Sequence, residues 1–224
     1  MKRDLKALIG QMTLEEKASL CSGSDFWHTQ GIERLGIPAV MVTDGPHGLR
    51  KQAGEADHLG LNDSVEAVCF PAGCATGSSF DPDLLEHMGQ VLGDECQAED
   101  VSILLGPAVN IKRSPLCGRN FEYMGEDPYL SSRMVVPYIE EVQKNGVAAC
   151  VKHFALYGAS ESGRDYNTVD MSRLRMYNEY LAPYKAAVDA GVGSVMSSFN
   201  IVDGIPATAN KWLLTDLLRN EWGF

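Results

Sequence analysis

Short apolar runs alternate with longer amphipathic segments along most of the chain, and this alternation predicts the secondary structure. The apolar runs, which predict five strands, cover residues 39–43, 69–75, 101–106, 147–152 and 193–199. The segments with helical periodicity cover residues 13–20, 81–97, 131–145, 172–190 and 210–220. Strands of nearly continuous apolar character that alternate with helices are typical of a parallel sheet covered by helices.

Residues that start and stop helices support these boundaries. Thr13 and Glu16 form a capping box, and Asp81 followed by Pro82 supplies a cap and a favourable first helical residue. Gly146 follows the third predicted helix, where a glycine commonly ends one. Strand–helix units of this kind suit either a doubly wound sheet or an incomplete (β/α)8 barrel, and the periodicity alone does not separate the two.

Polar side chains gather where the predicted strands end. Asp44 follows the first strand, Lys152 and His153 end the fourth, and Arg119 lies in the loop after the third. The carboxyl ends of parallel strands share one rim, where the active sites of barrels and open sheets form. Asp44 also fits an ordinary turn and Arg119 an ordinary surface ion pair, whereas two cationic groups ending an apolar strand are costly unless paired or used. Together with Met196 and Phe199 near the end of the fifth strand, these residues predict a site.

Lys152 and His153 raise a geometric problem, because adjacent residues on a regular strand point to opposite faces. For both side chains to reach one pocket, the backbone must distort. We therefore predict a strained or cis peptide at or next to this pair. A regular extended strand through Phe154 would contradict this prediction.

Composition narrows the ligand. The 224 residues include 45% hydrophobic ones, enough for one sizeable core, although a complete barrel needs about 250 residues. The 19 basic and 30 acidic residues give a net charge of −11, which disfavours nucleic acid and anionic membranes as partners. A neutral small molecule is the expected ligand.

The motifs of several common cofactors are missing from the sequence. The five histidines are scattered without a Cys–His cluster, so no metal is expected. Walker, GxGxxG and GxSxG patterns are also missing, so no nucleotide cofactor and no serine nucleophile elbow are expected. The six cysteines lack CxxC spacing and the first residues lack the apolar run of a signal peptide, which predicts free thiols and a cytoplasmic location.

Six stretches in order resemble glycoside hydrolase family 3, the β-glucosidases and their relatives. They read MTLEEKASL at 12–20, VTDGPHGLR at 42–50, GPAVNIKRSPLCGRNFEYMGEDP at 106–128, VKHFALYG at 151–158, GRDYNTVD at 163–170 and SVMSSFNIVDGIPATAN at 194–210. The resemblance implies an incomplete (β/α)8 TIM-type barrel with roughly the first five to six βα units. Residues 1–224 would form the N-terminal part of the catalytic barrel without an internal boundary, and the remaining barrel and an α/β-sandwich domain would be absent.

The resemblance also implies roles for the predicted site residues. Asp44 would bind the sugar hydroxyls farthest from the scissile bond, and Arg119, Lys152 and His153 would donate to the others. Such charge-assisted hydrogen bonds fit a neutral polyol. Met196 would supply apolar contact. Phe199 stands where many members have a tyrosine that reaches the nucleophile, so that hydrogen bond would be missing here.

The family's chemistry is retaining hydrolysis of terminal β-D-glucosidic bonds, here releasing glucose. Its nucleophile is an aspartate a few residues after a segment like Trp-Gly-Phe, so we expect it just beyond Phe224 and expect the isolated chain to be inactive. The acid/base would come from still later sequence. Carboxylates in the predicted loops are expected to be supporting or surface groups: Glu122, Glu126, Asp127 and Asp165. The KHFALYG stretch differs from the KHFPGHG-like stretch of members acting on N-acetylglucosamine, which argues against that branch.

Two other functions stay open. A barrel with Lys152 at its rim could be a Schiff-base lyase or aldolase with His153 as proton shuttle. A non-catalytic sugar-binding module would keep the binding groups without the reacting carboxylates. The expected partner is a β-glucoside or oligosaccharide. A barrel that stops after its fifth strand would also expose strand edges, which predicts poor solubility, self-association or completion by a missing C-terminal segment.

Overall fold

The computed structural model of the protein describes residues 4–54, 61–159 and 168–224. The strands are β1 Val42–Asp44, β2 Ile103–Leu105, β3 Ala148–Phe154, β4 Thr168–Val169, β5 Ser194–Ser197, β6 Ile201–Val202 and β7 Ile205–Pro206. The α-helices are α1 Leu5–Gln11, α2 Leu14–Ser19, α3 Gly73–Gly77, α4 Pro82–Ala98, α5 Pro128–Lys144, α6 Arg173–Arg175 and α7 Ala182–Asp189. Short 3-10 turns are η1 Glu33–Leu35, η2 Asn120–Glu122, η3 Tyr157–Ala159 and η5 Ala207–Ala209, and π-helical segments are η4 Met176–Tyr180 and η6 Trp212–Glu221.

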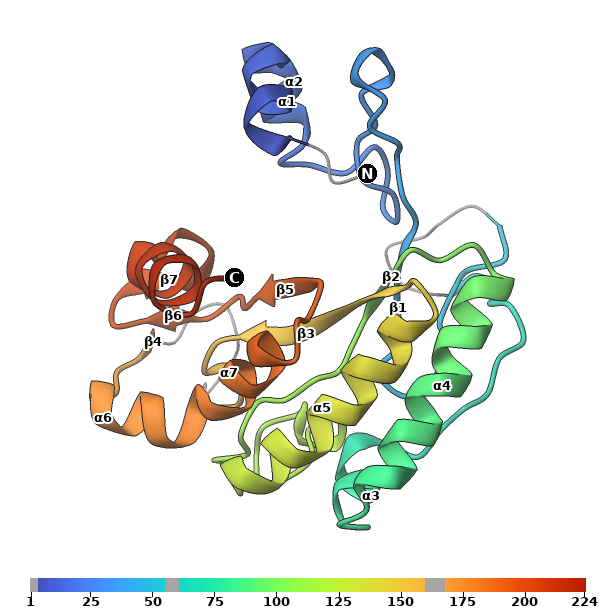
Figure 1. Ribbon diagram of the computed structural model, residues 1–224. Helices are drawn as coiled ribbons and strands as arrows, with labels where there is room; N and C mark the ends of the chain where they lie inside the picture. Colours follow the sequence, from blue (N-terminus) through green and yellow to red (C-terminus); the bar gives the residue numbers. More distant parts are fainter. Residues whose placement is uncertain (1–3, 55–60, 160–167) are drawn as a thin grey trace.

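The strand order of the main sheet distinguishes between the two architectures left open by the sequence. Within the described residues its strands are parallel and lie in the order β1-β2-β3-β5, the order in which the chain visits them. Helices α4, α5 and α7 lie beside one another on one side of this sheet (Figure 1). A doubly wound sheet reverses its winding at a switch point and carries helices on both faces, whereas a barrel winds in one direction. The fold is therefore part of a TIM-type (β/α)8 barrel, as predicted.

Helices α4 and α5 pack against each other and cover one side of the sheet. Each helix begins with an aspartate cap and a proline, Asp81-Pro82 and Asp127-Pro128, so the second helix starts three residues before its predicted first residue. Gly89 on α4 faces α5 so closely that a Cβ there would lie 2.8 Å from the carbonyl oxygen of Tyr138. The close approach lets Leu92 and Met134 become fully buried between the helices and the sheet.

One predicted strand is wrong. Residues 69–75 do not join the sheet, and from Gly73 onward they form α3, so the described main sheet has four strands instead of five. The run contains Pro71 and Gly73. Gly73 and the following Gly77 lie close to the chain around Glu122 and Met124, where the lack of a side chain allows the backbones to pack. Only Gly73 of this run is buried, and the other residues are exposed or partly exposed, so the apolar composition does not correspond to burial in a sheet.

The predicted helix 172–190 is interrupted. Its first part is α6 and the π-helical η4, where the Leu181 amide donates to the Met176 carbonyl over 2.8 Å, and α7 begins beyond it. Pro183 explains the break, because proline has no N–H and its ring clashes with the preceding helical turn. The helix α7 ends at Asp189 with Ala190 as its cap, and Gly191 follows with a φ of +77°.

A small second sheet combines β4, which precedes β5, with β6 and β7, which follow it, and was not predicted. It has the order β4-β6-β7, with β6 and β7 forming a hairpin. Asp203 and Gly204 form the turn, with φ values of +48° and +79°, as the Asp-Gly dipeptide favours.

The N-terminal segment stands apart from the sheet and its helices (Figure 1). Neither α1 nor α2 buries a residue, and Leu5, Ile9 and Leu14 are all more than half exposed. The predicted capping box is present, with Thr13 and Glu16 bonded reciprocally. Within the described residues no helix combines the length and the apolar character needed to span a membrane.

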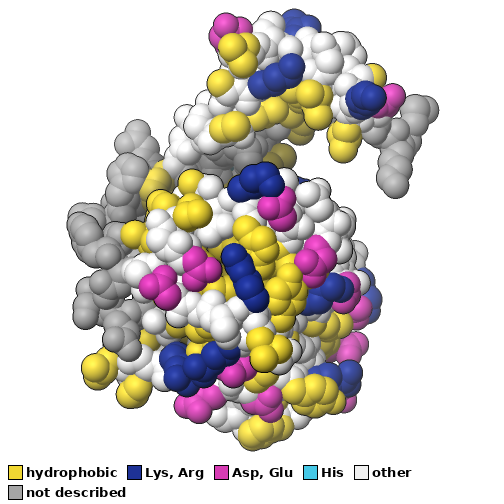
Figure 2. All heavy atoms as spheres, turned by 90° about the vertical axis from the view of Figure 1, so that its left-hand side faces the viewer, with side chains coloured by type: hydrophobic (Ala, Val, Ile, Leu, Met, Phe, Trp, Pro, Cys, Tyr) yellow, Lys and Arg dark blue, Asp and Glu magenta, His cyan; other side chains and the backbone are white. Residues whose placement is uncertain are grey.

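Figure 2 shows one face of the molecule, on which hydrophobic side chains gather among dispersed acidic and basic ones below the projecting N-terminal segment.

The C-terminal part of the chain contains a cation–π contact. The Arg173 guanidinium lies 3.2 Å from the centroid of the Trp212 ring, whose neighbour is Tyr177. The guanidinium covers an aromatic surface that would otherwise face water.

Two leucines of α4 test the packing of the helical layer. Leu92 is fully buried and Leu84 is 43% exposed. We expect Leu92→Ala to lower the free energy of unfolding by about 2–5 kcal/mol through lost burial and a residual cavity. Leu84→Ala, with the same chemistry, should change it by less than about 1 kcal/mol. Urea unfolding followed by circular dichroism measures both, and equal losses would contradict the described burial.

Candidate functional site

The rim of the barrel is organised around an ion pair between β1 and β3. The Lys152 ammonium lies 2.9 Å from Asp44 Oδ1, although 108 residues separate the two in sequence. The Lys152 residue is only 3% exposed. β1 and β3 are alternate strands that flank β2, and alternate strands of a barrel contribute side chains to the same interior layer. The structure therefore brings together two of the predicted residues.

The surroundings of Asp44 favour its ionised form. Burial alone would raise the pKa of this carboxyl, but the Lys152 charge and hydrogen bond, the Gly45 N–H and the Arg50 charge outweigh it, and the pKa lies below its ordinary value. Asp44 keeps one-third of its side chain exposed, so its second oxygen can accept hydrogen bonds from a ligand.

Arg50 belongs to the same group and was missed by the sequence analysis. Its backbone N–H donates to the Asp44 carbonyl over 2.9 Å, and its guanidinium lies 3.8 Å from Asp44 Oδ2. Thr43 Oγ1 donates to the Arg50 carbonyl over 2.7 Å, which closes the loop back on the strand. The stretch VTDGPHGLR could have indicated this pair, because only five residues separate Asp44 from Arg50 and a short loop can bring the two side chains together.

His153 is held by polar groups on both sides of the strand. Its backbone N–H donates to Asn110 Oδ1 over 2.9 Å, and its carbonyl accepts from Asn110 Nδ2 and from the Tyr184 hydroxyl. Its Nδ1 lies 3.3 Å from the Tyr123 hydroxyl. Burial raises the pKa of both tyrosines, so they remain neutral donors or acceptors. These contacts fix the ring of a residue that is 3% exposed.

The backbone distortion predicted at this pair is present. The Lys152–His153 peptide is cis, and so is Phe154–Ala155. The pairing of β3 with β5 shifts register between Val151 and Phe154.

Arg119 reaches the site from the loop after β2. Its Nε donates to Glu122, whose carboxylate is 3% exposed, and its guanidinium lies 5.5 Å from the centroid of the Tyr157 ring. The Tyr157 and His153 rings are in turn 4.9 Å apart. Burial lowers the pKa of Arg119, but the Glu122 bond and charge outweigh it and raise the pKa above its ordinary value. Glu122, predicted to be a supporting or surface group, is therefore a buried partner of Arg119.

The two remaining predicted residues lie on and after β5. Met196 is half-buried on the strand, and Phe199 follows the strand and is 61% exposed. Both stand at the same end of the sheet as Asp44 and Lys152, because β5 is parallel to β3. Their roles in ligand contact stay predictions.

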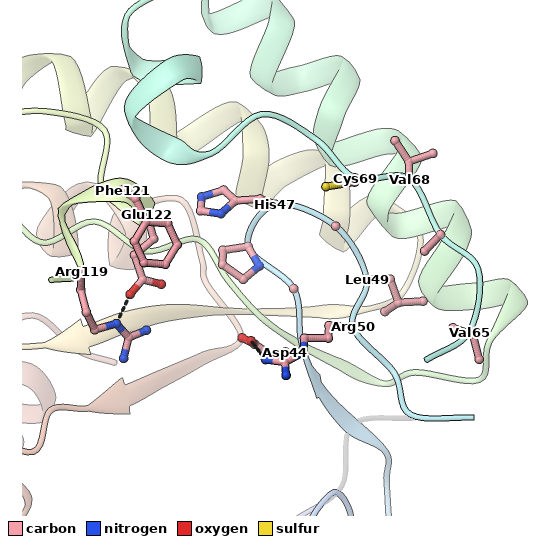
Figure 3. A pocket seen from close by; sticks show the side chains of 14 residues that line it. Asp44, His47, Leu49, Arg50, Val65, Val68, Cys69, Arg119, Phe121 and Glu122 are labelled. Atoms are coloured by element: carbon pink, nitrogen blue, oxygen red, sulfur yellow. Dashed lines mark hydrogen bonds and ion pairs between the residues drawn. The ribbon is translucent and has the colours of Figure 1, made fainter. Parts of the chain in front are cut away.

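A cavity of about 500 Å³ opens beside these groups, lined by Asp44, Arg50, Arg119 and Glu122 among others. Figure 3 shows the Arg119–Glu122 pair on one side of it and Asp44 at the end of β1, with Val65 and Val68 on the wall formed by another segment. Carboxylate and guanidinium groups in a partly apolar recess suit a small polar ligand. Within the described residues no group of three His, Cys, Asp or Glu side chains could hold a metal ion.

The other loop carboxylates have different surroundings. Asp127 caps α5, with its Oδ1 accepting from the Tyr129 N–H over 2.8 Å, and Glu126 is exposed. Asp165 lies outside the described residues.

Comparison with known proteins gives consistent matches. Residues 6–224 match the family described as Glycosyl hydrolase family 3 N terminal domain. The chain is 53% identical over 224 residues to a thermostable β-glucosidase B of Acetivibrio thermocellus, covering 99% of this chain and 29% of that protein. It is 46% identical over 220 residues to an exo-α-(1→6)-L-arabinopyranosidase of Bifidobacterium longum, covering 96% of this chain and 29% of that protein. It is similar to β-glucosidase 3B from Thermotoga neapolitana, solved in complex with α-D-glucose, with a TM-score of 0.89 at 36% identity, over 99% of this chain and 33% of that one. The chain therefore spans about a third of the length of these relatives.

The ion pair between Asp44 and Lys152 can be tested by Lys152→Met. This variant leaves Asp44 without its cation, and we expect a loss of about 2 kcal/mol in unfolding free energy at pH 7, below the ~3–5 kcal/mol of a fully buried pair. Lys185→Met, which removes an exposed pair with Asp189, should cost less than about 1 kcal/mol.

The pH dependence supplies a second check on this pair. Because the pKa of Asp44 is lowered by folding, its contribution is present above its unfolded pKa of about 3.9 and is lost as the pH falls through the folded value. The difference in unfolding free energy between the wild type and Lys152→Met should therefore become smaller in acid. Urea titrations at pH 7 and pH 3.5 measure it, and a difference that grows in acid would refute the assignment.

Proposed function

We propose that this chain, which belongs to glycosyl hydrolase family 3, forms the sugar-binding part of an enzyme that hydrolyses terminal β-D-glucosidic bonds. The observation that carries the proposal is the Asp44–Lys152 ion pair at the strand ends, with Arg119 and His153 beside it. The β-glucosidases among the relatives support the substrate class.

The polar groups of the rim complement a sugar. A glucose ring presents hydroxyls that both donate and accept, so it needs an acceptor such as the Asp44 carboxylate next to cationic donors. Hydrogen bonds to charged groups are about twice as strong as neutral ones, which offsets the loss of water from each hydroxyl. Lys152 is already oriented by Asp44, so a ligand that bonds to both would meet prearranged partners.

The reaction in this proposal is retaining hydrolysis. One carboxylate attacks the anomeric carbon, and a second group protonates the leaving oxygen. Among the described carboxylates near the cavity, Asp44 is paired with Lys152 and Glu122 with Arg119. We therefore assign the nucleophile and the acid/base to the part of the catalytic unit outside residues 1–224, and assign binding of the glycone to this chain.

Two alternatives are less well supported. Imine formation needs a free amine, whereas Lys152 Nζ is engaged in an ion pair with a buried environment around it, which disfavours a Schiff-base lyase. An α-L-arabinopyranoside is a second candidate glycone, because one relative with 46% identity is an exo-α-(1→6)-L-arabinopyranosidase.

We also propose a reducing, cytoplasmic location. All six cysteines are free in the structure, which supports the proposal without testing it.

Glucose binding is the direct test. We expect saturable chemical-shift changes near Asp44, Lys152 and Arg119 when glucose is titrated into the 15N-labelled chain. Asp44→Asn, which removes the charged acceptor, should weaken binding about tenfold or more. Asp203→Asn, which alters an exposed aspartate paired with Arg173, should leave the affinity unchanged. Shifts scattered over the surface, or equal effects of the two variants, would count against the site, and tighter binding of L-arabinose would favour the second glycone.

A mechanism-based label locates the nucleophile. After incubation with a 2-fluoro-β-glucoside that traps retaining glucosidases, we expect the intact chain to keep its unmodified mass. A fluoroglucosyl adduct on this chain would place the nucleophile within residues 1–224 and overturn the assignment above. Borohydride treatment with a carbonyl substrate is the companion experiment, because a stable adduct in that case would indicate a lyase.

A further inference from the structure

His47 lies three residues after Asp44, in the loop that follows β1. Its Nε2 accepts a hydrogen bond from the Gly73 N–H over 2.8 Å. A backbone N–H can only donate, so Nε2 must carry its lone pair, and the ring proton of the neutral histidine belongs on Nδ1. The ring also lines the cavity beside Asp44 (Figure 3).

The other contacts of this ring are to the loop that carries Arg119. The imidazole lies edge-on to the Phe121 ring with centroids 6.4 Å apart, and it lines a small recess together with Gly73 and Glu122. Gly73 is so close to the same loop that a Cβ there would be 2.3 Å from the Glu122 carbonyl oxygen. His47 thus connects the loop after β1, the first residue of α3 and the turn η2.

We propose that His47 is a positioning residue that holds Glu122, and through Glu122 the Arg119 guanidinium, in a fixed place relative to Asp44. This inference rests on the proposed function, in which Asp44 and Arg119 bind the same sugar. Asp44 and Lys152 stand on β1 and β3, each of which pairs with β2, whereas Arg119 stands on a loop without strand pairing. The His47 ring accepts a hydrogen bond from Gly73, which abuts the Glu122 carbonyl, and packs against Phe121, so it supplies the rigidity that the loop lacks.

The proposal requires a neutral ring. Protonation would place an N–H at Nε2 against the Gly73 N–H and remove that hydrogen bond. Burial, the largest effect, lowers the pKa of His47, and the Lys152 charge lowers it further. The charge and backbone of Glu122 and the charge of Asp44 raise it. The net pKa lies below the ordinary value of a histidine. The neutral form is therefore present above about pH 6.5, and the connection is lost as the pH falls through the folded value.

Nuclear magnetic resonance can observe the connection without a ligand. In the wild type we expect His47 to show protonated Nδ1 and unprotonated Nε2 at pH 7.5, and the Arg119 Nε–H to be protected from exchange by its bond to Glu122. His47→Ala should speed exchange of the Arg119 Nε–H about tenfold or more, and His47→Gln, which keeps an acceptor on a planar group, should restore most of the protection. His87→Ala, on the exposed face of α4, is the control. A protonated Nε2, or an Arg119 Nε–H unaffected by His47→Ala, would overturn the proposal.

Glucose affinity then tests the functional half. We expect His47→Ala to weaken binding about fivefold to tenfold, and to have less than about a twofold effect when Arg119→Ala is already present, because the two act in series. If His47→Ala weakens glucose binding as much in the Arg119→Ala background as in the wild type, His47 does not act through the Arg119 guanidinium. That result would refute the positioning role. If the wild type protects the Arg119 Nε–H but binds no glucose, the proposed function fails, while the connection made by His47 stands on the exchange data.

Discussion

The cost of burying the Lys152 ammonium is the constraint on which the rim of this barrel depends. An ammonium that is almost completely removed from water must have an ionised partner, and Asp44 is that partner. The pair fixes the end of β1 relative to the end of β3, on either side of β2. The loop that returns from Asp44 to Arg50, and the strand end that carries His153, are therefore placed by the same interaction. A site that binds a polar ligand can then use groups whose electrostatic arrangement exists before the ligand arrives.

The support of the site differs from one residue to the next. Lys152 and His153 stand on β3, which pairs with neighbours on both sides, and Asn110 and Tyr184 bond directly to the backbone of His153. Arg119 stands on a loop, and its geometry depends on side chains and on the packing of glycine against η2. Strands place their side chains through the regular ladder, whereas a loop needs individual contacts for each position. The buried Glu122 carboxylate and the ring of Tyr157 supply two such contacts.

Local patterns in the sequence predicted those parts of the fold that depend on local physics. The Asp81-Pro82 cap, the Thr13–Glu16 capping box and the glycine after α7 are visible in the sequence because their effects act within one helical turn. The same reasoning identified Asp44 and Lys152, since each stands at the end of an apolar run. The run at 69–75 was misjudged because a short apolar run requires neither burial nor strand pairing, and here only Gly73 is buried, against the loop that carries Glu122. Arg50 and the bonds of His153 to Asn110 and Tyr184 were missed because they join segments far apart in the chain or depend on loop closure. The choice between barrel and doubly wound sheet required the strand order, which no periodicity encodes.

The sequential order of the strands has a consequence for synthesis of the protein. Each βα unit packs mainly on the unit made just before it, so the sheet can grow from the N-terminus as the polypeptide leaves the ribosome. The partner of Asp44, however, is made 108 residues later. During that interval, on the order of 5–20 s at 5–20 residues per second, Asp44 must remain hydrated at the edge of a growing sheet. The first strand can therefore take its final electrostatic environment only when the third has been translated, and the ion pair is completed later than helices α4 and α5, which precede β3 in the chain.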